Sequence, residues 1–414
     1  MTHGAGGGRV GSVLHSLLYR GKELKSRLPA GLRDWTPEEL APLRALEARL
    51  RRTFEAWGYR EVATPVLEYL DTWTHAAGSG PASLFVVVDR SGELLALRPE
   101  LTASVARLVA TRGPEGVARL YYVGSVFRAD AGRGGSREFP QAGVERVGEG
   151  GADADAEVVA LAVEALREAG VAGARLGVGH AGFLRALLEA AGLQERSVPQ
   201  QALLRRDFVT LSALLEGAPE PVRQALLDLP SLRGRGALSS ARRLGVGGQA
   251  LEELEAVLEA LGAYGVAEHV EVDLGIIRDF DYYTGVVLEA YAPASGAPLL
   301  GGGRYDGLLE HFGASRPAVG FAVHLERVLS SCRLDVPPPP VLEVAYDPST
   351  RPQAVAWASK ARAAGLRVAT GPAQNGPPRA GVNFRADGVW WVDARGSRRL
   401  AASELDALLE GRTP

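Results

Sequence analysis

The alternation of apolar and polar positions predicts a long amphipathic helix near the start of the ordered part of the chain. Over residues 36–58, apolar side chains recur every three or four positions, as on one face of a helix. These positions are Leu40, Leu43, Leu46, Leu50 and Phe54. Thr36 and Glu39 have the spacing of a capping box, and Pro37 lies in the first turn. The helix is therefore predicted to begin at Thr36 and to end at Gly58.

Strand patterns follow this helix. Residues 61–68 have a strand-like composition, but Pro65 lacks an N–H group and favours the edge of a sheet. Two β-hairpins are predicted next, over residues 84–97 and 120–147, each with a turn rich in glycine or aspartate. Hairpins join antiparallel neighbours, so the sheet is expected to be mainly antiparallel.

The remaining pattern suggests how the chain divides into domains. Residues 1–28 are rich in glycine and are expected to be a flexible extension. The main domain is predicted over residues 29–333, with a helical insertion at about 179–265, where leucine and alanine recur at helical spacing. Four consecutive prolines make residues 334–340 a stiff linker, and residues 341–414 alternate strand and helix as a small α/β module. This module is predicted to contain strands over 342–345, 366–370 and 389–392, helices over 353–364 and 403–409, and a loop over 371–381. The fold class is α+β.

Composition excludes several classes of protein. The 414 residues are 46% hydrophobic and 23% charged, which is typical of globular domains. No apolar run reaches the roughly 18 residues of a membrane span, so a cytoplasmic protein is expected. The single cysteine, Cys332, cannot form an internal disulfide and is expected to be a small buried residue. A formal charge of −3 gives no overall attraction for nucleic acid, and His75, His180 and His311 lack ligand spacing. Neither a metal nor a cofactor is expected.

Two glycine-containing motifs are the most informative segments for the function of the chain. The segments LGIIRDFDYYTG (residues 274–285) and GGGRYDG (residues 301–307) resemble the histidine-recognition motifs of histidyl-tRNA synthetases. The order of the remaining motifs over residues 28–333 resembles the catalytic domain of that class II aminoacyl-tRNA synthetase. This resemblance implies an antiparallel sheet flanked by helices. It also implies a homodimer formed through motif 1, which contains the first helix and the strand with Pro65, while residues 320–327 correspond to motif 3.

The same resemblance assigns residues to the ammonium group of histidine. Glu100 and Thr102 of LRPELT, together with Gln141, would accept hydrogen bonds from the ammonium. Tyr282 and Tyr305 would line the pocket. A pocket of this kind rejects apolar analogues, because its polar groups would then be buried without partners.

The carboxylate and the imidazole of histidine are assigned in the same way. Arg278 would bind the carboxylate, and Glu145 and Tyr283 would address the imidazole. Arg128 of motif 2 belongs to the same set, since a forked guanidinium holds a carboxylate or a phosphate through two hydrogen bonds.

The nucleotide site departs from the synthetase pattern. Glycine is expected in synthetases where this chain has Leu101, Asp279 and His324, and the missing glycine side chain is what permits close approach of a ligand to the backbone. Asp130 replaces the usual glutamate of motif 2. We therefore expect Asp130, His324 and Arg327 to form a vestigial nucleotide site, in a protein that binds histidine without activating it.

This combination of features resembles the regulatory subunits of ATP phosphoribosyltransferase, which act in the first step of histidine biosynthesis. The resemblance implies a protein without catalytic residues that assembles with the short catalytic subunit, activates it and mediates feedback inhibition by L-histidine. Two alternatives are a functional histidyl-tRNA synthetase, with tRNA as its partner, and a tRNA-sensing pseudo-synthetase. Binding of tRNA is not expected, and we interpret Trp390 and Trp391 as core or interface residues rather than as a base-stacking surface.

Overall fold

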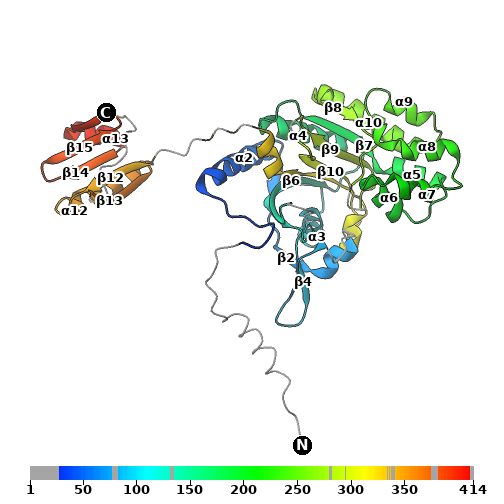
Figure 1. The fold of residues 1–414 in the computed structure, drawn as a ribbon, viewed down its shortest axis with the longest axis horizontal. Helices are drawn as coiled ribbons and strands as arrows, with labels where there is room; N and C mark the ends of the chain where they lie inside the picture. The colour runs from blue at the N-terminus through cyan, green and yellow to red at the C-terminus, as the bar shows by residue number, and fades with distance from the viewer. Residues whose placement is uncertain are drawn as a thin grey trace, which may run out of the picture. The chain divides into compact units, whose positions relative to one another are not determined.

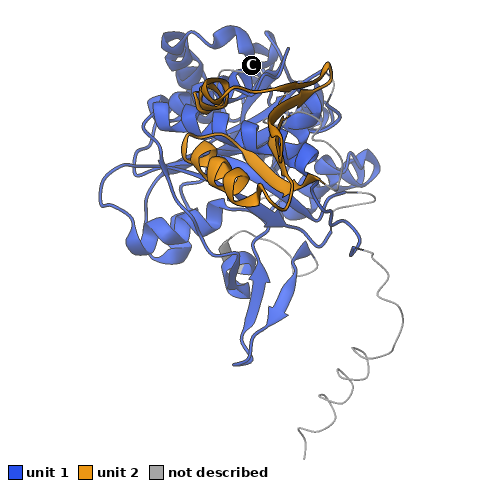
Figure 2. Cartoon of the chain, turned by 90° about the vertical axis from the view of Figure 1, so that its left-hand side faces the viewer, with its two compact units in different colours: residues 1–335 blue, residues 336–414 orange. Residues whose placement is uncertain are grey.

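The computed structural model contains two compact units, Met1–Asp335 and Val336–Pro414 (Figure 2). It describes residues 28–76, 83–130, 135–278, 282–293, 295–332, 334, 336, 341–373 and 381–410. Apart from Leu28, the predicted N-terminal extension lies outside the described residues, as do Asp279 and most of the predicted linker.

Unit 1 is built on an eight-stranded sheet with the strand order β1-β5-β6-β11-β10-β9-β7-β8. Its strands are β1 (Arg60–Glu61), β5 (Ala118–Phe127), β6 (Glu138–Val147), β7 (Arg175–His180), β8 (Val270–Val272), β9 (Val286–Tyr291), β10 (Leu300–Arg304) and β11 (Ala318–His324). The pairs β1–β5 and β7–β8 at the two edges are parallel, and the pairs between them are antiparallel. The predicted α+β class with a mainly antiparallel sheet is confirmed, and so is the predicted hairpin of β5 and β6.

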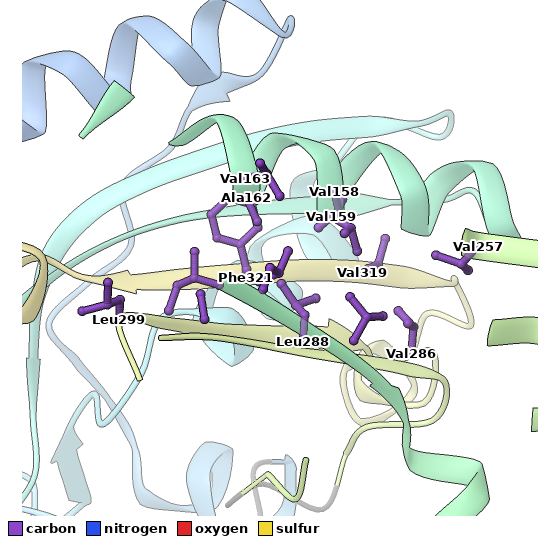
Figure 3. Packing of buried hydrophobic residues seen from close by; sticks show 14 of the residues in the cluster. Val158, Val159, Ala162, Val163, Val257, Val286, Leu288, Leu299, Val319 and Phe321 are labelled. Carbon is purple, nitrogen blue, oxygen red and sulfur yellow. The ribbon is translucent and has the colours of Figure 1, made fainter. Parts of the chain in front are cut away.

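Helices cover one face of this sheet (Figure 1). They include α2 (Pro37–Ala56), α4 (Ala152–Glu168) and α11 (Leu325–Ser331). In Figure 3, Val158 and Val159 of α4 lie against Val319 and Phe321 of β11, all fully or almost fully buried. Because side chains alternate along a strand, this packing turns the intervening residues of β11 toward the opposite face.

Helix α2 begins where the sequence predicted. Thr36 N donates to Glu39 Oε2 at 3.0 Å, and Glu39 N donates to Thr36 Oγ1 at 3.4 Å, which completes the predicted capping box. A cap of this kind stabilises a helix by about 1 kcal/mol. Leu46, Leu50 and Phe54 are fully buried, so the predicted apolar face is the one that packs on the sheet.

The segment between β7 and β8 is helical and lies at the far end of the sheet (Figure 1). It contains α5 (Ala181–Ala190), α6 (Ser197–Leu204), α7 (Phe208–Leu214), α8 (Glu220–Leu227), η3 (Leu229–Ser231), α9 (Ala237–Arg242) and α10 (Gly248–Tyr264), followed by η4 (Ala267–His269). We refer to residues 181–264 as the helical insertion.

A second, three-stranded sheet has the order β2-β4-β3, formed by β2 (Leu67–Tyr69), β4 (Leu94–Leu97) and β3 (Val86–Val88). The antiparallel pairing of β3 with β4 confirms the other predicted hairpin. The strand expected over residues 61–68 is instead broken into β1 and β2. Pro65 lies at the break, where it has no N–H to donate, and the buried guanidinium of Arg98 donates to Thr64 O at 2.8 Å. The helices η1 (Thr72–Ala76), α3 (Thr102–Arg112) and η5 (Leu308–Phe312) complete unit 1.

Unit 2 is a five-stranded sheet with the order β13-β12-β14-β15-β16. Its elements are β12 (Leu342–Tyr346), α12 (Arg351–Ala363), β13 (Val368–Pro372), β14 (Gly381–Arg385), β15 (Gly388–Asp393), β16 (Gly396–Arg399) and α13 (Ala402–Leu409). Strands β14 and β16 were missed in the sequence, because each has only four or five residues and includes glycine and arginine. Trp391 packs on the core with Phe384, and the Trp390 ring lies under the guanidinium of Arg385.

Across the described residues, every helix is too short or too polar to cross a lipid bilayer.

Candidate functional site

The candidate site is a narrow cavity on the face of the large sheet that α2 and α4 leave open. It measures about 40 Å³, enough for two or three water molecules at roughly 15 Å³ each. Except for Glu145, all the predicted histidine-binding side chains line it: Glu100, Thr102, Arg128, Gln141, Arg278, Tyr282, Tyr283 and Tyr305. Residues up to 205 positions apart in the chain are therefore brought together as the motif resemblance implied, although the binding of histidine there is a separate proposal.

Strand alternation decides which motif residues reach the cavity. Tyr305 follows β10 and points into the cavity, whereas Arg304 points to the opposite face. There its guanidinium holds both carboxylate oxygens of Asp155 on α4, at 2.6 and 3.2 Å, and contacts Asp306 at 3.0 Å. Burial raises the pKa of Asp155 to about 6 despite the opposing effect of Arg304. Arg304 thus joins the sheet to α4 and is not part of the pocket.

Gly301, Gly302 and Gly320 line the cavity without side chains, and two of them leave room for charged neighbours. A Cβ on Gly320 of β11 would lie closer than 3.0 Å to a carboxylate oxygen of Glu145, and a Cβ on Gly301 of β10 would collide with the guanidinium of Arg278. Glycine at these positions is therefore what allows both charged side chains to lie flat against the sheet.

Glu145 lies behind the tyrosines of the cavity. Its side chain is 1% exposed and accepts hydrogen bonds from the hydroxyl groups of Tyr305 and Tyr122, the latter at 3.3 Å. Burial is the main cause that raises the pKa of Glu145 to about 8, and these hydrogen bonds oppose it only in part. At neutral pH the carboxyl group is therefore largely protonated, so it can donate a hydrogen bond as well as accept one.

Glu100 and Gln141 supply further acceptors to the cavity. The Glu100 carboxylate accepts from the backbone N–H groups of Thr102 and Ala103, the latter at 2.8 Å, and so caps the start of α3. Burial raises the pKa of Glu100, and these two hydrogen bonds counteract the rise. The buried Oε1 atom of Gln141 has no hydrogen-bond partner within the described part of the chain. A buried acceptor without a partner is costly, so a ligand donor at this point would relieve an existing penalty.

Arg278 forms an ion pair that sequence reasoning missed. Its Nη1 atom contacts Glu289 Oε1 of β9 at 2.5 Å, and both side chains are largely buried. Tyr282 packs on the rings of Tyr283 and Tyr305, with centroids 4.7 and 5.8 Å apart. Glu289 lies outside both quoted motifs, and only the pairing of β9 with β10 brings it beside Arg278.

The predicted vestigial nucleotide site forms a second cavity of about 300 Å³, lined by Asp130, His324 and Arg327. Arg128 and His324 line both cavities, so the two adjoin. The His324 ring stacks on Phe139 with centroids 5.1 Å apart. Burial, and then the positive charges of Arg327, Arg128 and Arg278, hold the pKa of His324 well below its usual value, so the ring is neutral at pH 7.

Two residues that the sequence analysis left outside the site, His180 and Cys332, make contacts within the fold. His180 is buried, accepts from Gly182 N at 3.1 Å and contacts Glu253 at 3.0 Å. Cys332 is half-buried rather than fully buried and packs at the margin of the main core, and burial raises its thiol pKa. Within the described ranges there is no group of three His, Cys, Asp or Glu side chains able to hold a metal ion.

Comparison with known proteins agrees with this geometry. The family model described as histidyl-tRNA synthetase matches residues 31–328. An ATP phosphoribosyltransferase regulatory subunit from Moorella thermoacetica is 46% identical over 74% of this chain and 82% of its own length. One from Symbiobacterium thermophilum is 43% identical over 83% of this chain and 90% of its own length.

Solved structures show the same likeness. A crystal structure of an ATP phosphoribosyltransferase regulatory subunit/histidyl-tRNA synthetase from Bacillus halodurans superposes with a TM-score of 0.78 and 33% identity, covering 86% of this chain and 95% of that one. A histidyl-tRNA synthetase from Nostoc, at 21% identity and a TM-score of 0.72 over 94% of this chain and 100% of that one, shows the shared fold alone. The chain belongs to the histidyl-tRNA synthetase family and, within it, to the ATP phosphoribosyltransferase regulatory subunits.

Proposed function

We propose that this protein is the regulatory subunit of an ATP phosphoribosyltransferase in the first step of histidine biosynthesis. In this role it binds the short catalytic subunit, activates it and mediates feedback inhibition by L-histidine. The names of relatives that are 46% and 43% identical support the assignment as a regulatory subunit.

The observation that carries the histidine part of the proposal is the convergence of polar groups on one narrow cavity. Arg278 offers a cation for a carboxylate, and Gln141 offers a buried acceptor for an ammonium. The hydroxyl of Tyr283, which lines the cavity, offers a donor and an acceptor for an imidazole, and Glu145 lies behind the lining as the hydrogen-bond partner of Tyr305. Histidine is the amino acid whose three polar groups match this set.

The second cavity supports a non-catalytic role. The stacked rings of His324 and Phe139 line it, and Leu101, which is 2% exposed, lines the adjoining candidate histidine cavity. Nucleotide binding requires close approach to the backbone, and these side chains obstruct it. We therefore propose that Asp130, His324 and Arg327 are remnants of a nucleotide site and that the chain forms no aminoacyl-adenylate.

Inhibition requires that histidine bind one state of the complex more tightly than another, typically by about 1–3 kcal/mol. Histidine has more atoms than the two or three waters that the cavity accommodates. We propose that residues 282–285 and 304–306 rearrange around histidine and thereby change the surface offered to the catalytic subunit. Homodimerisation through α2 and a cytoplasmic location are part of the same proposal.

The test combines calorimetry with an inhibition assay. Titration of the purified protein with L-histidine should release heat, and the double variant Arg278→Gln/Glu145→Gln should lose both this signal and histidine inhibition of the assembled enzyme. Co-purification with the catalytic subunit should persist. Arg327→Gln is the matched control, because Arg327 lines only the second cavity.

Two results would contradict the proposal. If the double variant kept full sensitivity to histidine, the cavity would not be the site through which histidine inhibits the enzyme. Charging of tRNA, or exchange of pyrophosphate into ATP in the presence of histidine, would show a functional synthetase instead.

A further inference from the structure

Helix α5 of the helical insertion contacts the end of a segment that we call the pocket loop, Arg278 and residues 282–285, with residues 279–281 lying outside the described part of the chain. Ala181 N donates to Gly285 O at 2.9 Å, and Arg185 Nη2 donates to Tyr283 O at 3.4 Å. Ala181 and Arg185 are one turn apart, so both lie on the same face of the helix. Arg185 is half-buried, and its guanidinium forms no ion pair with any residue that the structure describes. Its guanidinium is therefore available to the main chain of the loop.

Helix α6 contacts the beginning of the same loop. Gln200 Nε2 donates to Arg278 O at 3.2 Å. Arg278 and Tyr283 flank residues 279–282 in the sequence, and their side chains line the candidate histidine cavity. The insertion thus holds the main-chain carbonyl groups of Arg278 and Tyr283.

Side chains leave part of the space around these contacts unfilled. A cavity of about 400 Å³ lies between the two helices and the loop, bounded by Leu184 and Leu188 of α5, by Ser197 of α6 and by Ile276 and Ile277. Arg278 and Tyr283 line this cavity as well as the smaller one. Where side chains leave such a space, the few polar contacts across it determine how the two sides are positioned.

We propose that Gln200 and Arg185 are positioning residues that couple the helical insertion to histidine binding. They hold the loop in the arrangement that presents Arg278 and Tyr283 to the ligand, and in return histidine orders α5 and α6. We call these two hydrogen bonds, from Gln200 and from Arg185, the tethers. Loss of either tether lowers the fraction of molecules whose pocket loop is arranged to bind histidine, and the apparent affinity for histidine falls by the same factor. This inference rests on the proposed function, because it assumes histidine as the ligand.

The first test is calorimetric titration with L-histidine. Gln200→Leu keeps the size of the side chain but removes the donor, and Arg185→Leu removes the other tether. Each should weaken histidine binding about three- to tenfold, the range expected for one hydrogen bond. Gln200→Lys, which restores a donor of similar reach, should recover most of the affinity. A side chain with a purely structural role would not show this recovery.

Two neighbouring positions provide matched controls. Gln201→Leu makes the same substitution one residue further along α6, at an exposed site. Arg196→Leu removes a guanidinium that lines the 400 Å³ cavity but pairs with Glu189. Both should bind histidine like the wild type. Wild-type affinity in Gln200→Leu and in Arg185→Leu would overturn the inference and leave the proposed function intact.

Amide hydrogen exchange tests whether Gln200 holds the loop, and it does not depend on the affinity for histidine. In the ligand-free protein, Gln200→Leu should speed amide exchange over residues 282–285, and Gln201→Leu should not. In the wild type, histidine should slow exchange in α5 and α6. Binding without that slowing would overturn the coupling. Absence of histidine binding in the wild type would contradict the proposed function, and unchanged exchange over 282–285 in Gln200→Leu would separately contradict the tether.

Discussion

Replacing Glu145 by glutamine should remove a large part of the pH dependence of stability. Glu145 is almost fully buried behind Tyr305 and Tyr122, and its pKa in the folded protein is about 8, against an ordinary value near 4.5. Between these two values the folded chain binds more protons at this site than the unfolded chain does. The free energy of unfolding of the wild type must therefore fall as pH rises through this range. Glutamine resembles the protonated carboxyl group at every pH and has no such dependence.

The magnitude follows from the difference between the two pKa values. At about 1.4 kcal/mol for each pKa unit, the site contributes a change of roughly 3 to 4 kcal/mol between pH 5 and pH 8. The two proteins should have similar free energies of unfolding near pH 5. Near pH 8 the Glu145→Gln variant should be the more stable by roughly 3 to 4 kcal/mol. The advantage should saturate above pH 8, where the wild-type carboxyl is ionised in both states.

Urea unfolding followed by circular dichroism at half-unit pH intervals would measure this difference. Other titrating groups, including Asp155 with its pKa of about 6, occur in both proteins and largely cancel in the comparison. Parallel stability curves for the two proteins would refute the argument that burial keeps Glu145 protonated. A variant whose stability falls relative to that of the wild type as pH rises would refute it as well.

Two further substitutions test the sheet around the site. Gly320→Ala should lower stability by about 1–3 kcal/mol and weaken histidine binding at least about tenfold, since the new methyl group meets Glu145 and the Val144 carbonyl. Gly307→Ala is its control, with φ of −79° and nothing within 4 Å of the added Cβ, and equal effects at the two positions would contradict the steric argument. Arg304→Ala should lower the free energy of unfolding by about 3–5 kcal/mol, because it leaves Asp155 buried without its partner. Adding Asp155→Ala should recover part of this loss, and a double-mutant cycle without coupling would rule out the pair as the cause.

Features set by local sequence were predicted well. The capping box of Thr36 and Glu39 and the apolar face of α2 depend on residues within a few positions of one another, and the structure contains both. The turns of the hairpins β3–β4 and β5–β6 are likewise encoded in short segments. The grouping of the pocket residues came from motif resemblance, since nothing local in the chain relates Glu100 to Tyr305.

Features set by long-range contact were not predicted. Glu289 becomes the partner of Arg278 only through strand pairing, and Arg304 is separated from Asp155 by nearly 150 residues of chain. The tethers from Gln200 and Arg185 end on main-chain carbonyl groups, which every residue has, so no residue type marks them in the sequence. Glu100 was expected to serve only a ligand, but its carboxylate also caps α3, because it lies two residues before the start of that helix.

The bare floor at Gly301 and Gly320 restricts how this pocket can change over evolutionary time. An added methyl group at Gly320 would meet a main-chain oxygen of the neighbouring strand, and main-chain atoms cannot move aside as a side chain can. At Gly301 it would displace the guanidinium that holds Glu289. Substitutions at Gly301 and Gly320 therefore cannot adjust the ligand preference of the pocket in small steps. New specificities must arise on the tyrosine-lined wall, where rings can be exchanged without moving a strand.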